Sequence, residues 1–168
     1  SFLIHGFSFS QSLTYYDLYE SQCDFAEAFY KENKNEFEQS ASSIGTTAAF
    51  LYAIVAPELT QFSYLKNAIE NHSLKVFYVQ GGKGYSNFSV GYFQMKPSFI
   101  ESLEKYIDQH SKYFKDYKHI LFKNPNSKNS RIERLERLNT LDWQLKYLTL
   151  FCAVVEYRFK NSIYKHHM

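Results

Sequence analysis

The sequence predicts a mostly helical, single-domain protein with a small β hairpin or irregular loop region in the middle of the chain. Apolar residues recur every three to four positions through most of the 168 residues, which is the period of an amphipathic helix. This period is lost between residues 74 and 95, where apolar and polar residues alternate and four glycines occur. The composition, 45% apolar and 21% charged, is typical of one globular domain of this length.

The first half of the chain predicts an amphipathic helix followed by an apolar one. The first is expected from Tyr16 to about Gln39, where large apolar residues are separated by Glu and Lys at helical spacing. A polar break then supplies Ser42 or Ser43 as an N-cap. The segment that follows, residues 44–56, is apolar on nearly every side, so we expect it to be the buried central helix.

Proline marks the boundaries of the next elements. Pro57 ends or kinks the central helix, because proline lacks the N–H donor that a helix interior needs, and Glu58 is therefore expected at or just past its C-terminal turn. A shorter helix is expected over residues 61–72, and Pro97 opens another after the glycine-rich stretch. Residues 123–130 form a polar surface loop, and the apolar spacing beyond them predicts one or two long helices.

The composition disfavours several classes of function. A net charge of +2 and the lack of an RNA- or DNA-binding motif argue against nucleic acid as a partner. No run of about 18 apolar residues occurs, so no membrane span is expected. The six histidines show no metal-ligand spacing, and we expect neither a metal ion nor another cofactor.

The opening residues 1–11 are apolar. They lack Lys and Arg and contain the small residues Ser8 and Ser10, as the end of a secretory signal peptide does. We therefore expect an exported protein, periplasmic or extracellular, with its single domain over residues 12–168. The alternative is an apolar arm that packs on the domain.

Cys23 and Cys152 lie far apart in the sequence and fit no metal spacing. Each falls within an apolar helical pattern, so both are expected on the core-facing sides of the first and last long helices. In an oxidising compartment they could form a disulfide, and two free buried thiols are equally consistent with the sequence.

Two segments in the middle of the chain carry the candidate chemistry. The first, AIVAPE, ends at Glu58, and the second, GYFQMKP, begins 33 residues later at Gly91. A buried helix ending in A-I-x-x-x-E, followed by G-x-x-Q-x-x-P at the start of a helix, resembles the lytic transglycosylase and goose-type lysozyme superfamily. The resemblance covers about residues 43–110, and Leu59 stands where the family commonly has Ser.

This resemblance implies an α+β lysozyme-like fold, in which a helical domain carries a small β hairpin or loop region beside the substrate cleft. It also implies peptidoglycan as the substrate, Glu58 as the catalytic acid, and Gly91 and Gln94 in the lining of the cleft. In the family the glycine lets the backbone approach the sugar, and the glutamine amide hydrogen-bonds the substrate. A late tyrosine usually contributes to these sites, and Tyr147 and Tyr157 are the candidates here.

Three further residues are candidate sugar contacts because of their chemistry and place in the loop region: Ser89, Tyr92 and Tyr85. A tyrosine offers a flat apolar face together with a hydroxyl group, both of which suit a sugar ring. Packing within the loop is the alternative for each of the three.

The proton donor must be held in its neutral form. A carboxyl group protonates a glycosidic oxygen near neutral pH only when its surroundings disfavour the charged form. We expect burial in the apolar helix and the negative end of the helix dipole to keep Glu58 protonated. A lone Glu at a helix end is more often a solvated surface residue, and the second motif decides for the catalytic interpretation.

The number of carboxylates favours a transglycosylase over a hydrolase. Inverting and retaining glycosidases use two carboxylates, whereas between Glu58 and Gly91 the sequence offers only Glu70, which its helical context places on the surface. In lytic transglycosylases one Glu protonates the leaving oxygen and then helps the sugar's own 6-hydroxyl to close an anhydro ring. Two alternatives remain: a non-catalytic lysozyme-like protein that binds peptidoglycan or a protein partner, and a helical interaction module without a carbohydrate role.

Overall fold

The protein is built from helices. The computed structural model describes residues 14–65 and 71–165, and the prediction of a mostly helical protein is confirmed within them. The elements in chain order are α1 (Tyr15–Leu18), α2 (Glu20–Glu32), α3 (Lys34–Ser43), α4 (Ala48–Leu65), α5 (Asn71–Gly81), α6 (Pro97–Gln109), the 3-10 helix η1 (Lys115–Ile120), α7 (Lys128–Leu138) and α8 (Leu141–Lys165). The N-terminal arm, residues 1–11, lies outside the described residues.

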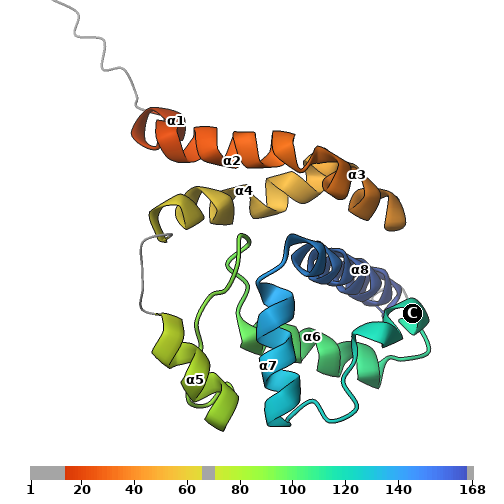
Figure 1. The fold of residues 1–168 in the computed structure, drawn as a ribbon. Helices are drawn as coiled ribbons and strands as arrows, with labels where there is room; N and C mark the ends of the chain where they lie inside the picture. Colours follow the sequence, from red (N-terminus) through yellow and green to blue (C-terminus); the bar gives the residue numbers. More distant parts are fainter. Residues whose placement is uncertain (1–13, 66–70, 166–168) are drawn as a thin grey trace, which may run out of the picture.

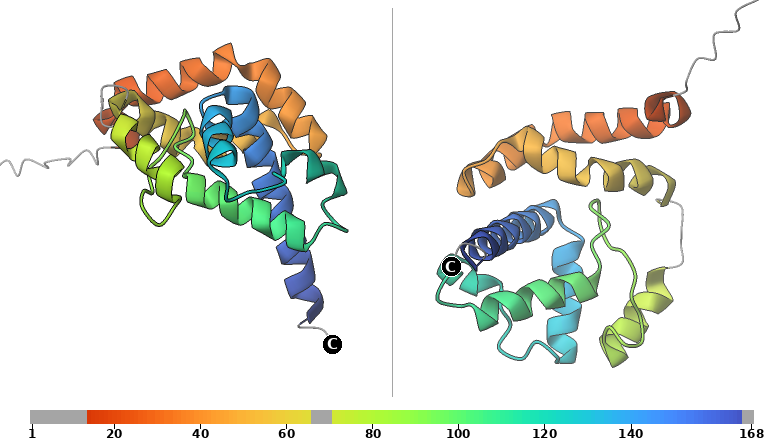
Figure 2. Two further views of the ribbon diagram at one scale, coloured as in Figure 1. Left: turned by 60° about the horizontal axis from the view of Figure 1, so that its bottom comes forward. Right: turned by 180° about the vertical axis from the view of Figure 1, so that it is seen from behind.

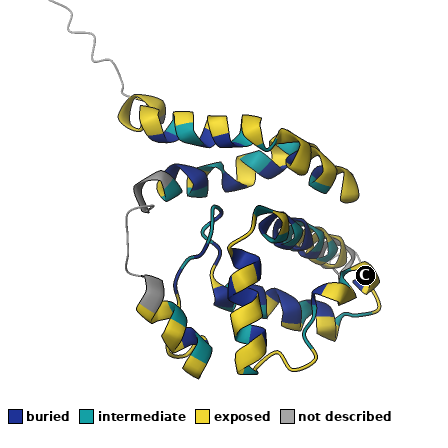
Figure 3. Cartoon of the chain, in the orientation of Figure 1, coloured by how far each residue is buried: buried dark blue, intermediate teal, exposed yellow. Residues whose placement is uncertain are grey.

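The helices form two layers with α8 between them (Figure 1). Helices α2 and α3 pack on α4, and α3 also packs on α8. Below α8 lie α6 and α7, which both contact it, while α5 packs on α7 at the edge of the molecule. Figure 2 shows that the C-terminal part of α8 extends beyond this body. Figure 3 shows the buried residues on the inward faces of the helices, around α8 and between α2 and α4.

The predicted first helix is divided at Asn33, so its continuous course from Tyr16 to Gln39 is wrong. The Asn33 side-chain amide donates to the Phe29 carbonyl at 2.8 Å, which satisfies a carbonyl at the end of α2. A short polar side chain of this kind competes with the helix for its own hydrogen bonds. The result is two shorter helices, α2 and α3, which both pack on α4.

The end of α3 corrects the predicted N-cap. Gly45 has φ +67°, its N–H donates to the Ser42 carbonyl at 3.2 Å, and the next N–H donates to the Ala41 carbonyl at 3.0 Å. These two bonds form a Schellman motif, which terminates a helix at glycine. Ser42 and Ser43 therefore end α3, and it is the Thr47 hydroxyl that caps α4, by accepting from the Phe50 N–H at 3.2 Å.

Helix α4 is buried on one face and not on every side. Leu51, Val55 and Leu59 are buried, whereas Phe50 retains 50% of its surface exposed. The helix also continues through Pro57 to Leu65. A proline removes a single N–H donor, and rings of α2 contact α4 on both sides of it, Tyr30 on Tyr52 and Phe25 on Phe62. Glu58 consequently lies inside the helix, seven residues before its end, and the prediction that it stands at the C-terminal turn is wrong.

The region predicted as a hairpin or loop is partly helical. Residues 71–81 form α5. Of the helix predicted over residues 61–72, residues 61–65 belong to α4 and residues 71–72 to α5, while residues 66–70 lie outside the described residues. Helix α5 buries Tyr78 and leaves Val76 and Phe77 exposed, so it packs on the protein by one face. Only residues 82–96 are irregular, and among the described residues the sole β pairing is an isolated antiparallel bridge between Val90 and Met95, with no strand.

The remaining elements agree with the sequence in part: residues 128–130, predicted as the end of the loop over residues 123–130, form the first turn of α7, and η1 was not predicted. Helix α6 begins with Pro97 in its first turn, the hydroxyl of Ser127 caps α7 by accepting from Ser130 N–H, and the last helical pattern forms two helices, α7 and α8. Cys23 on α2 and Cys152 on α8 are partly buried free thiols. Across the described ranges no single helix has the length and hydropathy of a membrane span, while α3 and Ala48–Phe62 pass that test only jointly across a bend of 116°.

Candidate functional site

The G-x-x-Q segment forms a tight turn closed by the Val90–Met95 bridge, whose two N–H···O bonds measure 2.9 and 3.1 Å. Both ends of the motif have left-handed backbone, with φ +74° at Gly91 and +47° at Gln94. The Gly91 carbonyl accepts from the Gln94 backbone N–H at 3.2 Å and from its side-chain amide at 2.7 Å. A left-handed conformation is uncommon for a residue with a side chain, and such conformations concentrate at functional sites.

A buried glutamine from α8 braces this turn, and neither sequence motif includes it. The Gln144 side chain is fully buried, its Oε1 accepts from the Phe93 N–H at 2.7 Å, and its Nε2 donates to the Leu138 carbonyl at 2.9 Å. A Cβ on Gly91 would lie 2.2 Å from Nε2 and 2.3 Å from the Leu138 carbonyl oxygen. Gly91 is therefore needed because a larger residue would collide with Gln144 and the Leu138 carbonyl. The resemblance to the family implied a different reason, the approach of the backbone to a sugar.

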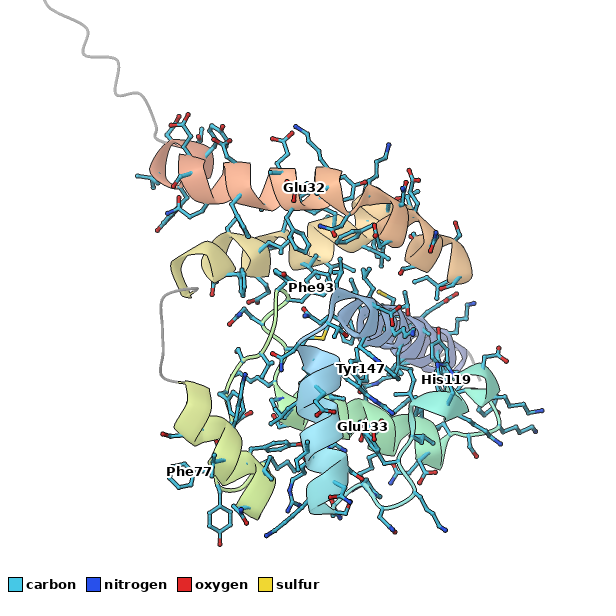
Figure 4. All side chains as sticks on the ribbon, in the orientation of Figure 1. Glu32, Phe77, Phe93, His119, Glu133 and Tyr147 are labelled. Atoms are coloured by element: carbon cyan, nitrogen blue, oxygen red, sulfur yellow. The ribbon has the colours of Figure 1, made fainter. Side chains whose placement is uncertain are left out.

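Aromatic rings fasten the turn to α2 and α4. The Tyr92 ring lies 5.0 Å from the Phe62 ring on α4 and 4.7 Å from the Phe29 ring on α2, and Phe25 closes a cluster of four rings. Figure 4 shows Phe93 in the layer between α4 and α8, where it is buried. The structure thus places Tyr92 in a packing role, and contact of its hydroxyl with a sugar stays a prediction.

Glu58 lies on α4, one helical turn before the ring that contacts this turn. It precedes Phe62 by four residues, and residues four apart on a helix lie on the same face. The Phe62 ring contacts Tyr92, so the residue on which the G-x-x-Q segment packs follows Glu58 by one helical turn. Glu58 is half-buried, and its neighbour Leu59 is fully buried in the core. The helix-dipole effect expected at a helix end does not apply, because it is confined to the last turn.

The other predicted site residues lie in different surroundings. Ser89 is half-buried at the base of the turn. Tyr85 is 77% exposed, with its ring over Gly81 of α5. Of the two late tyrosines, Tyr147 is fully buried, and burial raises its pKa to about 12. Tyr157 is partly buried beside the rings of His110, Tyr113 and Phe114, in the segment between α6 and η1. Glu70 lies outside the described residues.

A second buried polar cluster holds the lower layer together. The Arg134 guanidinium on α7 bonds both oxygens of Glu104 on α6, at 2.6 and 3.1 Å, and donates to the Tyr78 hydroxyl on α5 at 2.8 Å. Burial opposes the charge on Arg134, and the bonds and attraction from Glu104 more than offset it, so the pKa of Arg134 is raised. This cluster fixes α5 and α6, the two helices that flank the irregular segment, in relation to α7.

No group of three or more His, Cys, Asp or Glu side chains in the part of the chain that the structure describes is arranged to hold a metal ion. The polar groups of the turn are the Gln94 carboxamide and backbone amides, which can hydrogen-bond a sugar, and the Glu58 carboxyl group on α4 is the candidate proton donor. Comparison of the chain with protein-family models, curated proteins and solved structures gives no match.

Proposed function

We propose that the protein cleaves peptidoglycan glycan strands between N-acetylmuramic acid and N-acetylglucosamine, in the manner of a lytic transglycosylase, with Glu58 as general acid and base. One observation carries the proposal. The G-x-x-Q turn, with Gln94 in left-handed backbone, packs through Tyr92 on the ring that follows Glu58 by one helical turn. The helix, irregular loop and proline-opened helix α6 also support a lysozyme-like arrangement of these elements.

In the proposed reaction Glu58 acts twice. Its carboxylic acid gives a proton to the glycosidic oxygen, and the bond from that oxygen to the anomeric carbon of muramic acid breaks. The resulting carboxylate then takes the proton of the sugar's 6-hydroxyl, whose oxygen bonds to the anomeric carbon and closes the anhydro ring. Glu58 ends protonated as it began, so a single carboxyl group completes the cycle and no water is consumed.

Gln94 would orient the substrate. Its side-chain amide nitrogen is engaged by the Gly91 carbonyl at 2.7 Å, which fixes the direction of the carboxamide. The carbonyl oxygen at the other end of that group can accept a hydrogen bond from a sugar hydroxyl or an N-acetyl N–H. Ser89 and the hydroxyl of Tyr92 belong to the same segment and are proposed as lesser contacts, with Tyr85 further out. The exported location expected from the N-terminal segment would place the protein where its substrate is.

The decisive experiment is the Glu58→Gln variant on purified peptidoglycan. The substitution keeps the shape and removes the acid, so we expect release of soluble fragments to fall by about a hundredfold or more. Glu32→Gln is the matched control, because Glu32 is an exposed residue on the outer helix α2 (Figure 4). Mass spectrometry should find muramic ends lighter by one water than the hydrolysis product. Full activity of Glu58→Gln would refute the assignment.

The alternative is a lysozyme-like protein that binds peptidoglycan without cleaving it. It is favoured by Leu59, which is fully buried where the resembled family commonly has Ser, so that position offers no hydroxyl beside Glu58. Binding to insoluble peptidoglycan in a sedimentation assay, with no fragments released by the unmodified protein, would select this alternative.

A further inference from the structure

The Gln144 carboxamide joins three parts of the fold at one buried point. It comes from the first turn of α8, accepts the Phe93 N–H of the turn, and donates to the carbonyl of Leu138 at the end of α7. The last carbonyls of a helix have no partner within that helix, so Leu138 is an acceptor that needs an external donor. The Gln144 Nε2 therefore supplies the hydrogen bond that the last carbonyl of α7 lacks, and Oε1 of the same carboxamide holds the turn.

The contact is specific to an amide. One end must accept from Phe93 and the other must donate to Leu138, which a neutral carboxamide does and a carboxylate does not. The bond to Phe93 is short, at 2.7 Å, and the side chain has no exposed surface. The missing Cβ of Gly91 provides the space that the amide occupies, so the two residues form a matched pair.

The bonded residue, Phe93, directly precedes Gln94. Left-handed backbone at Gln94 persists only when the surroundings fix it more strongly than its own preference opposes it. The Val90–Met95 bridge and the Gly91 carbonyl bind the turn to itself, while Gln144 ties its tip to α7 and α8 by direct hydrogen bonds. Without the Gln144 side chain, the turn would keep its internal hydrogen bonds and lose the bond from the Phe93 N–H that connects it to α7 and α8.

We infer that Gln144 is a positioning residue for the proposed cleavage, which sets the orientation of Gln94 toward the substrate without touching the substrate itself. The inference rests on the proposed function. Loss of the amide should weaken the productive binding of glycan more than it slows proton transfer, because Glu58 belongs to α4, which Gln144 does not bond. The expected signature is a raised apparent KM for peptidoglycan with a smaller change in kcat.

Two substitutions separate the bonds. Gln144→Leu removes both, and Gln144→Glu keeps the acceptor for Phe93 and loses the donor for Leu138. We expect kcat/KM to fall about tenfold or more in Gln144→Leu, mainly through KM, and the Phe93 amide to exchange with solvent at least about tenfold faster. Because Gln144→Glu keeps the acceptor for the Phe93 N–H, both the loss of kcat/KM and the rise in Phe93 exchange should be smaller in it than in Gln144→Leu.

Leu148→Ala is the matched control for general destabilisation, because Leu148 is a buried residue one turn further along α8 without a bond to the turn. It should lower the unfolding midpoint and leave kcat/KM and the relative exchange of Phe93 unchanged at a temperature where all variants are folded. Provided that the unmodified protein cleaves peptidoglycan, an unchanged KM together with unchanged Phe93 exchange in folded Gln144→Leu would overturn the inference. An unmodified protein that neither binds nor cleaves peptidoglycan would instead overturn the proposed function, and the inference with it.

Discussion

Replacing Gly91 with alanine tests the geometry of the turn. An L residue in left-handed backbone costs about 1–2 kcal/mol, and φ at Gly91 is +74°. The new Cβ would also meet Gln144 Nε2 at 2.2 Å and the Leu138 carbonyl oxygen at 2.3 Å. The carbonyl belongs to the backbone at the end of α7 and moves only with that helix, so overpacking adds about 1–3 kcal/mol. We expect a loss of about 2–5 kcal/mol in the free energy of unfolding.

Gly45→Ala is the control that isolates the backbone contribution. Gly45 has φ +67°, close to that of Gly91, and a Cβ there would meet nothing within 4 Å. Its replacement should therefore cost only the backbone share, about 1–2 kcal/mol. Guanidinium chloride unfolding followed by circular dichroism gives both values, provided that the m-value is unchanged. Equal losses for the two variants would refute the close approach of Gln144 and Leu138 to Gly91.

Three further predictions concern other contacts. Arg134→Met leaves the Glu104 carboxylate buried without its partner and should cost about 3–5 kcal/mol, and adding Glu104→Leu to it should recover much of that loss in the same unfolding assay. Tyr92→Phe should retain stability because the ring contacts remain, so a fall in peptidoglycan cleavage without a fall in stability would identify the hydroxyl as a substrate contact. Burial raises the pKa of the Cys152 thiol, so at pH 8 a smaller fraction of it is thiolate in the folded protein than in the unfolded one. In a Cys23→Ser background, iodoacetamide should therefore alkylate Cys152 more slowly in the folded protein than in denaturant, and equal rates would contradict the burial.

The sequence alone determined that the protein is mostly helical and where several of its helices lie. Helical periodicity is a local property, so α2, α6 and α8 could be predicted from the spacing of their apolar residues, and Pro97 marked the start of α6. The two candidate motifs, ending at Glu58 and beginning at Gly91, were likewise visible as short patterns.

Only the tertiary structure decided how those patterns are used. The alternation and glycines of residues 74–95 predicted a small β hairpin or irregular loop region, but the start of this stretch belongs to α5, which packs on α7 and leaves Val76 and Phe77 exposed. Pro57 could not reveal whether α4 ends or continues, because that depends on whether packing against α2 outweighs one missing hydrogen bond.

The hydrogen bond from Phe93 to Gln144 could not be predicted from local patterns either, because it joins residues far apart in the sequence. Gln144 is a polar residue within an apolar helical stripe, which is the one signal that could have drawn attention to it. Its partner Phe93 lies 51 residues away, and the role of Gly91 follows from the space that Gln144 occupies. Periodicity specifies which face of a helix is apolar, whereas the groups that meet across elements are fixed only when the helices pack, because buried donors and acceptors must then find partners in three dimensions.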